Sequence, residues 1–336
     1  MKEKTYLEIS SWFIVKALLV LILFYLLFVI RDIIALFIVV LILTATFRPT
    51  INKWEKHIKR LPAVLALLII AILMLAFISY IIIPPVLDQT SQLFANLPYY
   101  LTKLSFLKNY STEIKQNLSS ISKEFTGGVV SFTAGVFGGV ISFLTAVIMT
   151  IYLLLDRNGL NNFVKSFFPT DQSESIIEVG RKVAHKVGNW FRGQMILGVI
   201  IAAVDLIGLL IIGVPFALSL AIISGVLEII PTIGPMIAGI IAVLVALADA
   251  PWKGLAVLIL YVVVQQLENN ILVPKIMQKA VGLSPVIIIL AILIGAKLLG
   301  IVGAILAVPV SAGISVIIGE WPVLKMIMRK NDPVSS

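Results

Sequence analysis

Four ionisable residues lie within or at the edge of apolar sequence in the C-terminal half of the chain: Asp205, Glu228, Glu268 and Lys297. A charge at the centre of a bilayer costs at least about 2.5–3.5 kcal/mol, so it is retained for pairing, for a water-filled cavity or for transport. The three carboxylates can titrate, and the chemistry they indicate is translocation of an ion or a polar solute.

A glycine- and proline-containing break lies one helical turn beyond Glu228. It separates the apolar arms Ala217–Ile230 and Met236–Ala248. Each arm has about 14 residues, or roughly 21 Å at 1.5 Å per residue, so neither spans the membrane core alone. We therefore predict a re-entrant hairpin whose tip presents unpaired backbone groups to ions or solutes. The tip residues assigned to the transport path are Pro231, Thr232, Gly234 and Pro235.

A second hairpin-like unit follows, with arms Pro285–Ile294 and Ala304–Ile318. Convergence of the two tips would bring Glu228 and Lys297 together near the midplane. Three interpretations remain open for that pair: an ion pair that locks the tips, a gate or ion-coupled site, or exposure at an interface. The residues assigned to the path in this unit are Gly295, Lys297, Gly300 and Gly303.

Two polar clusters adjoin the hairpins. The first runs from Gln265 through Glu268 to Asn270, with Pro274 beyond it, and it is either part of the path or a solvated helix end. The second contains Arg192 and Gln194, which we assign to a membrane anchor or gate.

Composition defines the class of protein. Sixty per cent of the 336 residues are hydrophobic and 13% are charged, and the mean hydropathy is +1.09. Soluble domains are nearer half apolar and a quarter charged, so lipid must cover much of this surface. We predict an all-α polytopic integral membrane protein with about eight membrane helices, including the two inverted hairpins.

Enzymatic classes are disfavoured. The chain has no cysteine and only two histidines, which excludes thiolate chemistry and a histidine-rich metal site. No catalytic constellation, phosphate-binding loop or metal-ligand spacing is present, so we expect no catalytic residues, no metal and no cofactor. The net charge of +9 comes from basic residues in short loops. That placement favours lipid headgroups over nucleic acid as the partner.

The chain divides into six segments. The apolar runs Trp12–Ile30, Ile33–Phe47 and Leu61–Ile83 predict the first spans, with a basic loop at Arg48–Arg60. A stripe from Ile176 to Trp190 predicts an interfacial helix on an anionic leaflet. The segments are N-terminal membrane helices (1–85), an extracytoplasmic amphipathic segment (86–126), a transmembrane helix (127–155), a cytoplasmic interfacial segment (156–192), the C-terminal transport region (193–325) and a cytoplasmic tail (326–336).

The basic residues orient these segments. With both termini in the cytoplasm, 19 of the 26 lysines and arginines fall on the cytoplasmic side, as the positive-inside rule requires. We expect a multi-pass protein of a prokaryotic cytoplasmic membrane, with the first hairpin entering from outside and the second from inside.

The C-terminal motifs resemble those of the AI-2E family, the autoinducer-2 exporter-like transporters of bacteria and archaea. The matching segments are Trp190-Phe-Arg-Gly-Gln194, Gly213-Val-Pro-Phe-Ala217, Glu228-Ile-Ile-Pro-Thr-Ile-Gly-Pro235, Gln266-Leu-Glu-Asn-Asn270, Gly282-Leu-Ser-Pro285, Gly300-Ile-Val-Gly303 and Ala307-Val-Pro309. Lys297 departs from the small or apolar residues common in the family.

The resemblance implies a homo-oligomer, with pentamers the family expectation, that exports a small polar solute. Our leading hypothesis is export of an autoinducer-2-like solute by alternating access. One alternative is Na⁺(Li⁺)/H⁺ antiport, with Na⁺ or H⁺ as the coupling ion. The other is a membrane scaffold that binds partners through 86–126 and 156–192 without transport.

Overall fold

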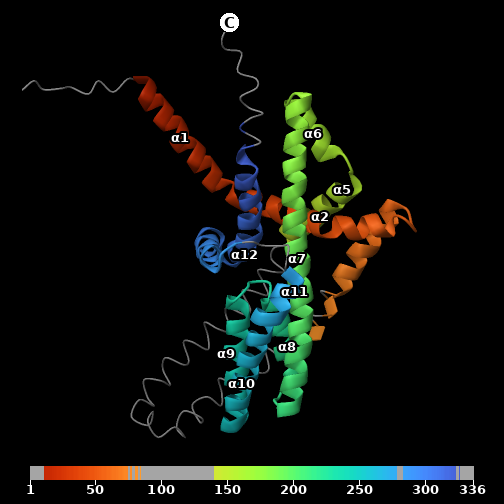
Figure 1. Ribbon diagram of the computed structural model, residues 1–336, viewed down its shortest axis with the longest axis vertical. Helices are drawn as coiled ribbons and strands as arrows, with labels where there is room; N and C mark the ends of the chain where they lie inside the picture. Colours follow the sequence, from red (N-terminus) through yellow and green to blue (C-terminus); the bar gives the residue numbers. More distant parts are fainter. Residues whose placement is uncertain are drawn as a thin grey trace, which may run out of the picture.

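The computed structural model describes residues 11–74, 76–77, 80–81, 84, 140–277, 283–322 and 325. Every regular element in these ranges is a helix, which confirms the all-α prediction (Figure 1). Four of the helices are long and apolar enough to cross a membrane, or five if one bent pair is a single span, and shorter apolar helices accompany them. The predicted 86–126 segment and the start of the 127–155 helix lie outside the described residues.

The N-terminal part consists of α1 (Ser11–Val29) and α2 (Arg31–Trp54), followed by a helix over Arg60–Met74. In Figure 1, α1 extends away from the rest of the molecule. The predicted start of the basic loop at Arg48 is wrong, because α2 continues past Phe47 and through Pro49 to Trp54. The basic loop is therefore shorter than predicted.

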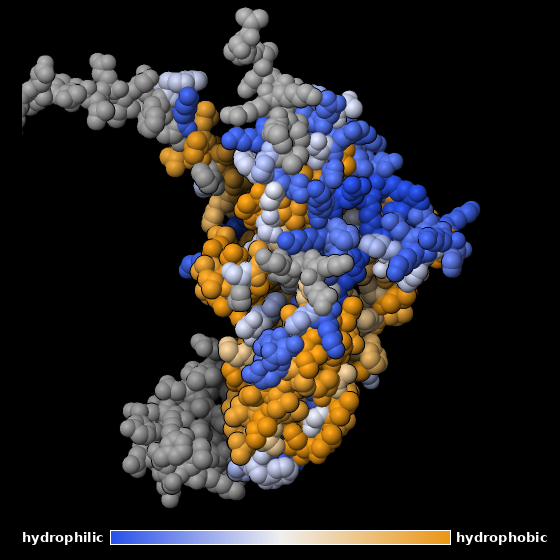
Figure 2. Space-filling view, in the orientation of Figure 1, coloured by the Kyte–Doolittle hydropathy of each residue, from blue (hydrophilic) through white to orange (hydrophobic). Residues whose placement is uncertain are grey.

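The longest element is α7 (Thr170–Ile212), which has 43 residues. It follows α5 (Val140–Leu155) and α6 (Gly159–Phe167) and ends at Gly213, whose φ of 73° is the left-handed conformation that caps helices at their C-termini. Polar residues gather over its N-terminal half, whereas hydrophobic residues surround its other half (Figure 2). No backbone break marks the predicted boundary between 156–192 and 193–325.

The apolar stripe on the polar half of α7 is buried within the protein. Val187 is 7% exposed and shares a cluster with Ala35 and Ile42 of α2 and with Leu306 of α12. The chain's own helices therefore cover this part of the stripe, while the assignment of 156–192 to a membrane interface stays a prediction.

The C-terminal part contains the two expected chain reversals. The first joins α8 (Ala217–Leu227) to α9 (Ile233–Asp249), which is followed by α10 (Pro251–Leu267). A π-helix, η2 (Glu268–Leu272), and the short α11 (Val273–Met277) continue from α10. The second reversal lies within α12 (Pro285–Gly319), where Gly300 has non-helical angles.

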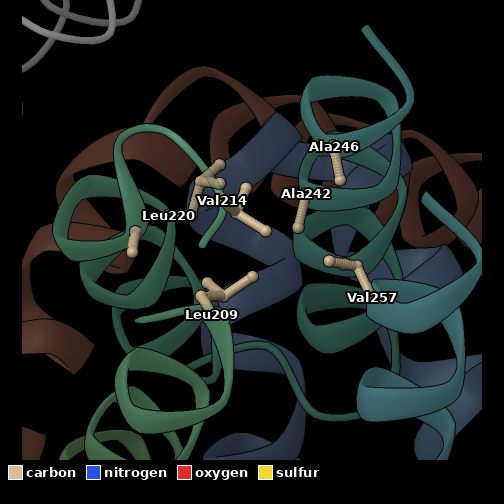
Figure 3. Close-up of a cluster of buried hydrophobic side chains, with 7 residues drawn as sticks. Leu209, Val214, Leu220, Ala242, Ala246 and Val257 are labelled. Carbon is tan, nitrogen blue, oxygen red and sulfur yellow. The ribbon is translucent and has the colours of Figure 1, made fainter. Parts of the chain in front are cut away.

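A hydrophobic cluster holds α7, α8, α9 and α10 together (Figure 3). Alanines on α9 allow that helix to approach its neighbours closely. The buried members of the cluster are Leu209, Val214, Ala217, Leu220, Ala242, Ala246 and Val257. The cluster fixes the helices that carry the buried acidic residues.

Candidate functional site

One face of α7 carries two buried polar residues among apolar ones. Gln194 is 4% exposed and Asp205 is 1% exposed. They lie about three turns apart, or roughly 16 Å along the helix axis. This face contacts α8 and α10, so α7 supplies polar groups at two levels of one packed interface.

Glu228 follows the last residue of α8 and is 1% exposed. The Gln194 side-chain amide donates hydrogen bonds to the Glu228 backbone carbonyl and, at 3.1 Å, to its Oε1 atom. The other carboxylate oxygen, Oε2, is buried without a hydrogen-bond partner among the described residues. Gln194 therefore fixes the Glu228 carboxylate and leaves one of its oxygens free for a ligand or a proton.

Close helix packing makes this contact possible. A Cβ atom at Gly198 would lie 2.5 Å from the Gly225 carbonyl oxygen, and one at Gly225 would lie 2.5 Å from the Gly198 oxygen. Since Cβ atoms do not tolerate such distances, only glycine fits at both positions. The crossing brings α8 close enough for Gln194 to reach Glu228.

Asp205 is buried between α7, α8 and α10. Neither of its carboxylate oxygens has a hydrogen bond of good geometry among the described residues. The hydroxyl groups that act on it are those of Ser224 and Tyr261, which hydrogen bond to each other at 2.8 Å. Sequence reasoning missed these two hydroxyls, although Ser224 lies one helical turn before Glu228 and Tyr261 one turn before Gln265.

Glu268 is 5% exposed and begins the π-helix. The Gln265 side-chain amide donates to its Oε2 atom at 3.1 Å. Short π-helical segments occur frequently at functional sites. The other predicted residues of this region point elsewhere, because Asn270 is exposed and bonds to Gln266 at 3.1 Å, and Pro274 is also exposed.

The three carboxylates form one electrostatic group. Glu228 interacts with both Glu268 and Asp205, and Glu268 also interacts with Asp205. Within the described part of the chain, no lysine or arginine forms an ion pair with any of them. No three ligating side chains converge there on a single metal position.

The first chain reversal is strained at Thr232, which has φ 70° and ψ −49°. The Ile233 amide donates to the Pro231 carbonyl at 2.8 Å. Those angles with that hydrogen bond define the classic γ-turn, a rare and strained conformation. Next to it, a Cβ atom at Gly234 would lie 1.8 Å from the Leu227 carbonyl oxygen, so the hairpin closes only with glycine there. Pro235 is buried in the first turn of α9.

The second reversal depends on three glycines. Gly300 has φ 61° and ψ −141°. A Cβ atom at Gly295 would lie 2.2 Å from the Gly303 carbonyl oxygen, and one at Gly303 would lie 1.9 Å from the Gly295 oxygen. The two arms of α12 therefore contact each other closely beside the turn.

The structure does not bring Glu228 and Lys297 together as an ion pair. Lys297 is exposed and has no ion pair among the described residues, whereas Glu228 is buried against Gln194. The two hairpin units instead share an apolar cluster, in which Ile230 and Ile233 pack with Ile292 and Val308. Trp190 also belongs to this cluster. The ion pair that would lock the two tips is thus not formed, and the gate and interface interpretations stay predictions.

Arg192 links two helices. Its guanidinium donates to the Thr46 carbonyl of α2 at 3.0 Å and to the Asn189 side chain on its own helix. Of the two residues assigned to an anchor or gate, Gln194 contacts the acidic group and Arg192 joins α7 to α2.

This arrangement defines a polytopic α-helical protein whose buried acidic groups lie where four helices meet, which is the architecture of a membrane transporter. The chain belongs to the AI-2E family of transporters, whose pattern it matches over residues 15–323.

Similar proteins align with this sequence over most of its length. The candidate transport protein YueF of Bacillus subtilis (strain 168) is 31% identical over 293 residues, covering 81% of this chain and 79% of YueF. The candidate transport protein YrrI of the same strain is 28% identical, covering 79% of this chain and 80% of YrrI. The candidate permease PerM of Escherichia coli (strain K12) is 25% identical, covering 82% of this chain and 83% of PerM. These three similar proteins carry the names of transport proteins or permeases, which points away from an enzyme.

Proposed function

We propose that this protein is a secondary transporter that exports a small polar solute, with autoinducer-2-like molecules as the expected class. The observation that supports it is the group of three buried carboxylates, Asp205, Glu228 and Glu268, without a basic partner among the described residues. Such a group favours a ligand that brings hydroxyl donors or positive charge. The free Oε2 atom of Glu228 is the acceptor we assign to it.

Alternating access in this proposal rests on the α8–α9 hairpin. Its tip adjoins Glu228 and is held by a strained turn at Thr232. Re-entry of this hairpin into the membrane fits the short apolar arms. The orientation with both termini in the cytoplasm, insertion in the cytoplasmic membrane and homo-oligomeric assembly belong to the same proposal.

The experiment is solute flux from proteoliposomes, with wild type compared with Glu228→Gln and with the control Glu178→Gln. Glu178 is exposed on the polar half of α7. Flux of an autoinducer-2-like solute should fall in Glu228→Gln and persist in the control. Absence of flux in every protein, or equal flux in Glu228→Gln and wild type, would contradict the proposal.

Cation/proton antiport is the second candidate, and Asp205 is the observation that favours it. Its two carboxylate oxygens are buried without a hydrogen bond of good geometry among the described residues, an environment suited to a group that binds and releases a proton or Na⁺. This candidate expects Na⁺- or Li⁺-dependent dequenching of a pH dye, lost in Asp205→Asn. A dye response without any solute flux would favour it over solute export.

One surface that a membrane scaffold would use to bind partners is covered within this chain. The apolar stripe of α7 within 156–192 is covered by α2 and α12. Other parts of 156–192 stay exposed, including Phe163 and Phe167 of α6, and 86–126 lies outside the described residues. The scaffold hypothesis expects that deletion of either segment abolishes the phenotype, whereas point substitutions in the hairpins do not.

A further inference from the structure

Three arginines meet at the C-terminal end of α5, away from the acidic group. Arg60 Nε donates to the Leu154 carbonyl at 2.6 Å, and Arg48 Nη2 donates to the Arg157 carbonyl at 2.6 Å. The chain bends by 81° between α5 and α6 at this point. In this arginine cluster (Arg48, Arg60 and Arg157), Arg48 and Arg60 thus satisfy carbonyl groups that a helix end leaves unpaired.

The arginine cluster has too few carboxylates. Glu55 accepts from Arg157 and, at 3.0 Å, from Arg60. The hydrogen bond from Arg157 holds the pKa of the Glu55 carboxylate below its usual range, so Glu55 is ionised at neutral pH. Asp156 also lies near Arg48, but its Oδ1 accepts from the backbone amides of Asn158 and Gly159 at 3.1 and 2.8 Å.

Some guanidinium N–H donors of the arginine cluster have no acceptor among the described residues. Among the described residues no carboxylate hydrogen bonds to Arg48, and repulsion by Arg60 and Arg157 is offset only in part by Asp156. Arg60 Nη2 is buried with no hydrogen-bond partner among the described residues. The Arg157 side chain is 59% exposed, and within the described part of the chain one of its five donors is hydrogen bonded. An anion that approached along Arg157 would meet unused donors and uncompensated positive charge.

The surroundings identify the kind of anion. Lys53, Lys56 and Lys59 are exposed on the segment that connects Arg48 to Arg60. The helix that starts at Arg60 then presents exposed apolar side chains at four-residue spacing, which lie on one side of a helix. These side chains are Leu61, Leu65, Ile69 and Leu73. Unpaired basic groups next to an exposed apolar stripe match a phosphate headgroup followed by acyl chains.

We propose that the arginine cluster binds the phosphate of an anionic phospholipid, with its acyl chains along the Leu61–Leu73 stripe. Arginine suits this role because its planar fork matches two phosphate oxygens. Arg157 makes the outer contact, while Arg48 supplies the charge behind it. The site is separate from the transport path and does not depend on the proposed function.

The test uses the full chain in detergent and measures the unfolding midpoint as lipid is added. Phosphatidylglycerol and phosphatidylcholine with identical acyl chains are compared, with inorganic phosphate as a third arm. The variants are Arg157→Gln, Arg157→Lys and the control Lys165→Gln, which removes one exposed charge from α6. Native mass spectrometry counts bound phosphatidylglycerol on the same samples, so lower starting stability of a variant does not obscure the result.

Phosphatidylglycerol should raise the wild-type midpoint more than phosphatidylcholine, and inorganic phosphate should leave it unchanged. In Arg157→Gln the apparent affinity for phosphatidylglycerol should weaken by at least about fivefold, the effect of one basic residue near an anionic headgroup. Arg157→Lys should be intermediate, and Lys165→Gln should resemble wild type. An equal response of Arg157→Gln and Lys165→Gln would overturn the proposal. A response to inorganic phosphate equal to that of the lipid would overturn the assignment to a phospholipid.

Discussion

The two chain reversals of the C-terminal half turn by different physical means. Between α8 and α9 the turn is a γ-turn centred on Thr232, and the buried Glu228 lies one helical turn before it. Within α12 the turn is made by Gly300, and the charged residue beside it, Lys297, is exposed. The first reversal therefore combines backbone strain with a buried carboxyl group, whereas the second has a glycine at its turn and an exposed lysine.

This difference indicates which reversal is suited to change conformation during transport. Strained backbone persists only where surrounding contacts enforce it, and it concentrates at sites where function needs it. The α12 reversal has a backbone that glycine adopts readily and arms in close contact. We expect the α8–α9 reversal to be the sensitive element and the α12 reversal to be a fixed support.

The largest expected effect is on solute flux, and it distinguishes Glu228 from Lys297. Glu228→Gln should lower solute flux by at least about tenfold, or roughly 1.4 kcal/mol in the barrier, since it removes a buried titratable carboxylate. Lys297→Gln should leave flux near the wild-type value, because Lys297 has no ion pair among the described residues. Flux from proteoliposomes measures both, and a comparable loss in Lys297→Gln would remove the distinction between the hairpins.

The next effect concerns the close contacts in both reversals. Gly234→Ala and Gly303→Ala should each lower the free energy of unfolding by roughly 1–3 kcal/mol, because the added methyl group meets backbone atoms. Gly319→Ala is the matched control, since a Cβ atom there has nothing within 4 Å. Thermal unfolding in detergent measures all three, and equal midpoints would show that the contacts relax without cost.

Substitutions at Thr232 and Gly300 should change the free energy of unfolding in opposite directions, because one relieves backbone strain and the other introduces it. Thr232→Gly should stabilise the protein by about 0.5–2 kcal/mol, because relief of strain exceeds the entropy that glycine adds to the unfolded chain. Thr232→Ala keeps the strained backbone and should give no such gain. Gly300→Ala should destabilise by roughly 1–3 kcal/mol, although a Cβ atom at Gly300 has nothing within 4 Å. The same unfolding measurement applies, and destabilisation by Thr232→Gly would contradict the assignment of strain.

The smallest effect concerns the outer end of α12. Lys182 Nζ lies 2.9 Å from Glu320 Oε1, joining α12 to the polar half of α7. Glu320→Gln should cost less than about 1 kcal/mol, as partly exposed ion pairs do. The cost should shrink further at high salt because ions screen the pair. Unfolding midpoints at low and high ionic strength provide the measurement, and a cost independent of salt would indicate packing instead of charge.

Much of this arrangement could be predicted from the sequence because prolines and glycines limit local backbone geometry. The break at Pro231–Pro235 was expected, and the structure has the turn there. Glu228 and Glu268 were expected to be significant because charges in apolar sequence are costly, and both are buried.

Other features depend on contacts between distant segments. The partnership of Gln194 with Glu228 requires two helices to cross at Gly198 and Gly225, and the sequence does not reveal which glycines meet. The orientation of Lys297 depends on rotation of its helix, since one residue changes the direction of a side chain by about 100°. The continuity of α7 was missed because a change in hydropathy at residue 193 does not require a change in backbone.

That continuity has a mechanical consequence. At 1.5 Å per residue, α7 is about 65 Å long and carries Lys182 near one end and Asp205 near the other. No loop lies between them to absorb motion. A tilt or rotation imposed on the polar half of α7, for example through its contact with α12, would therefore be transmitted along the helix to Gln194 and Asp205.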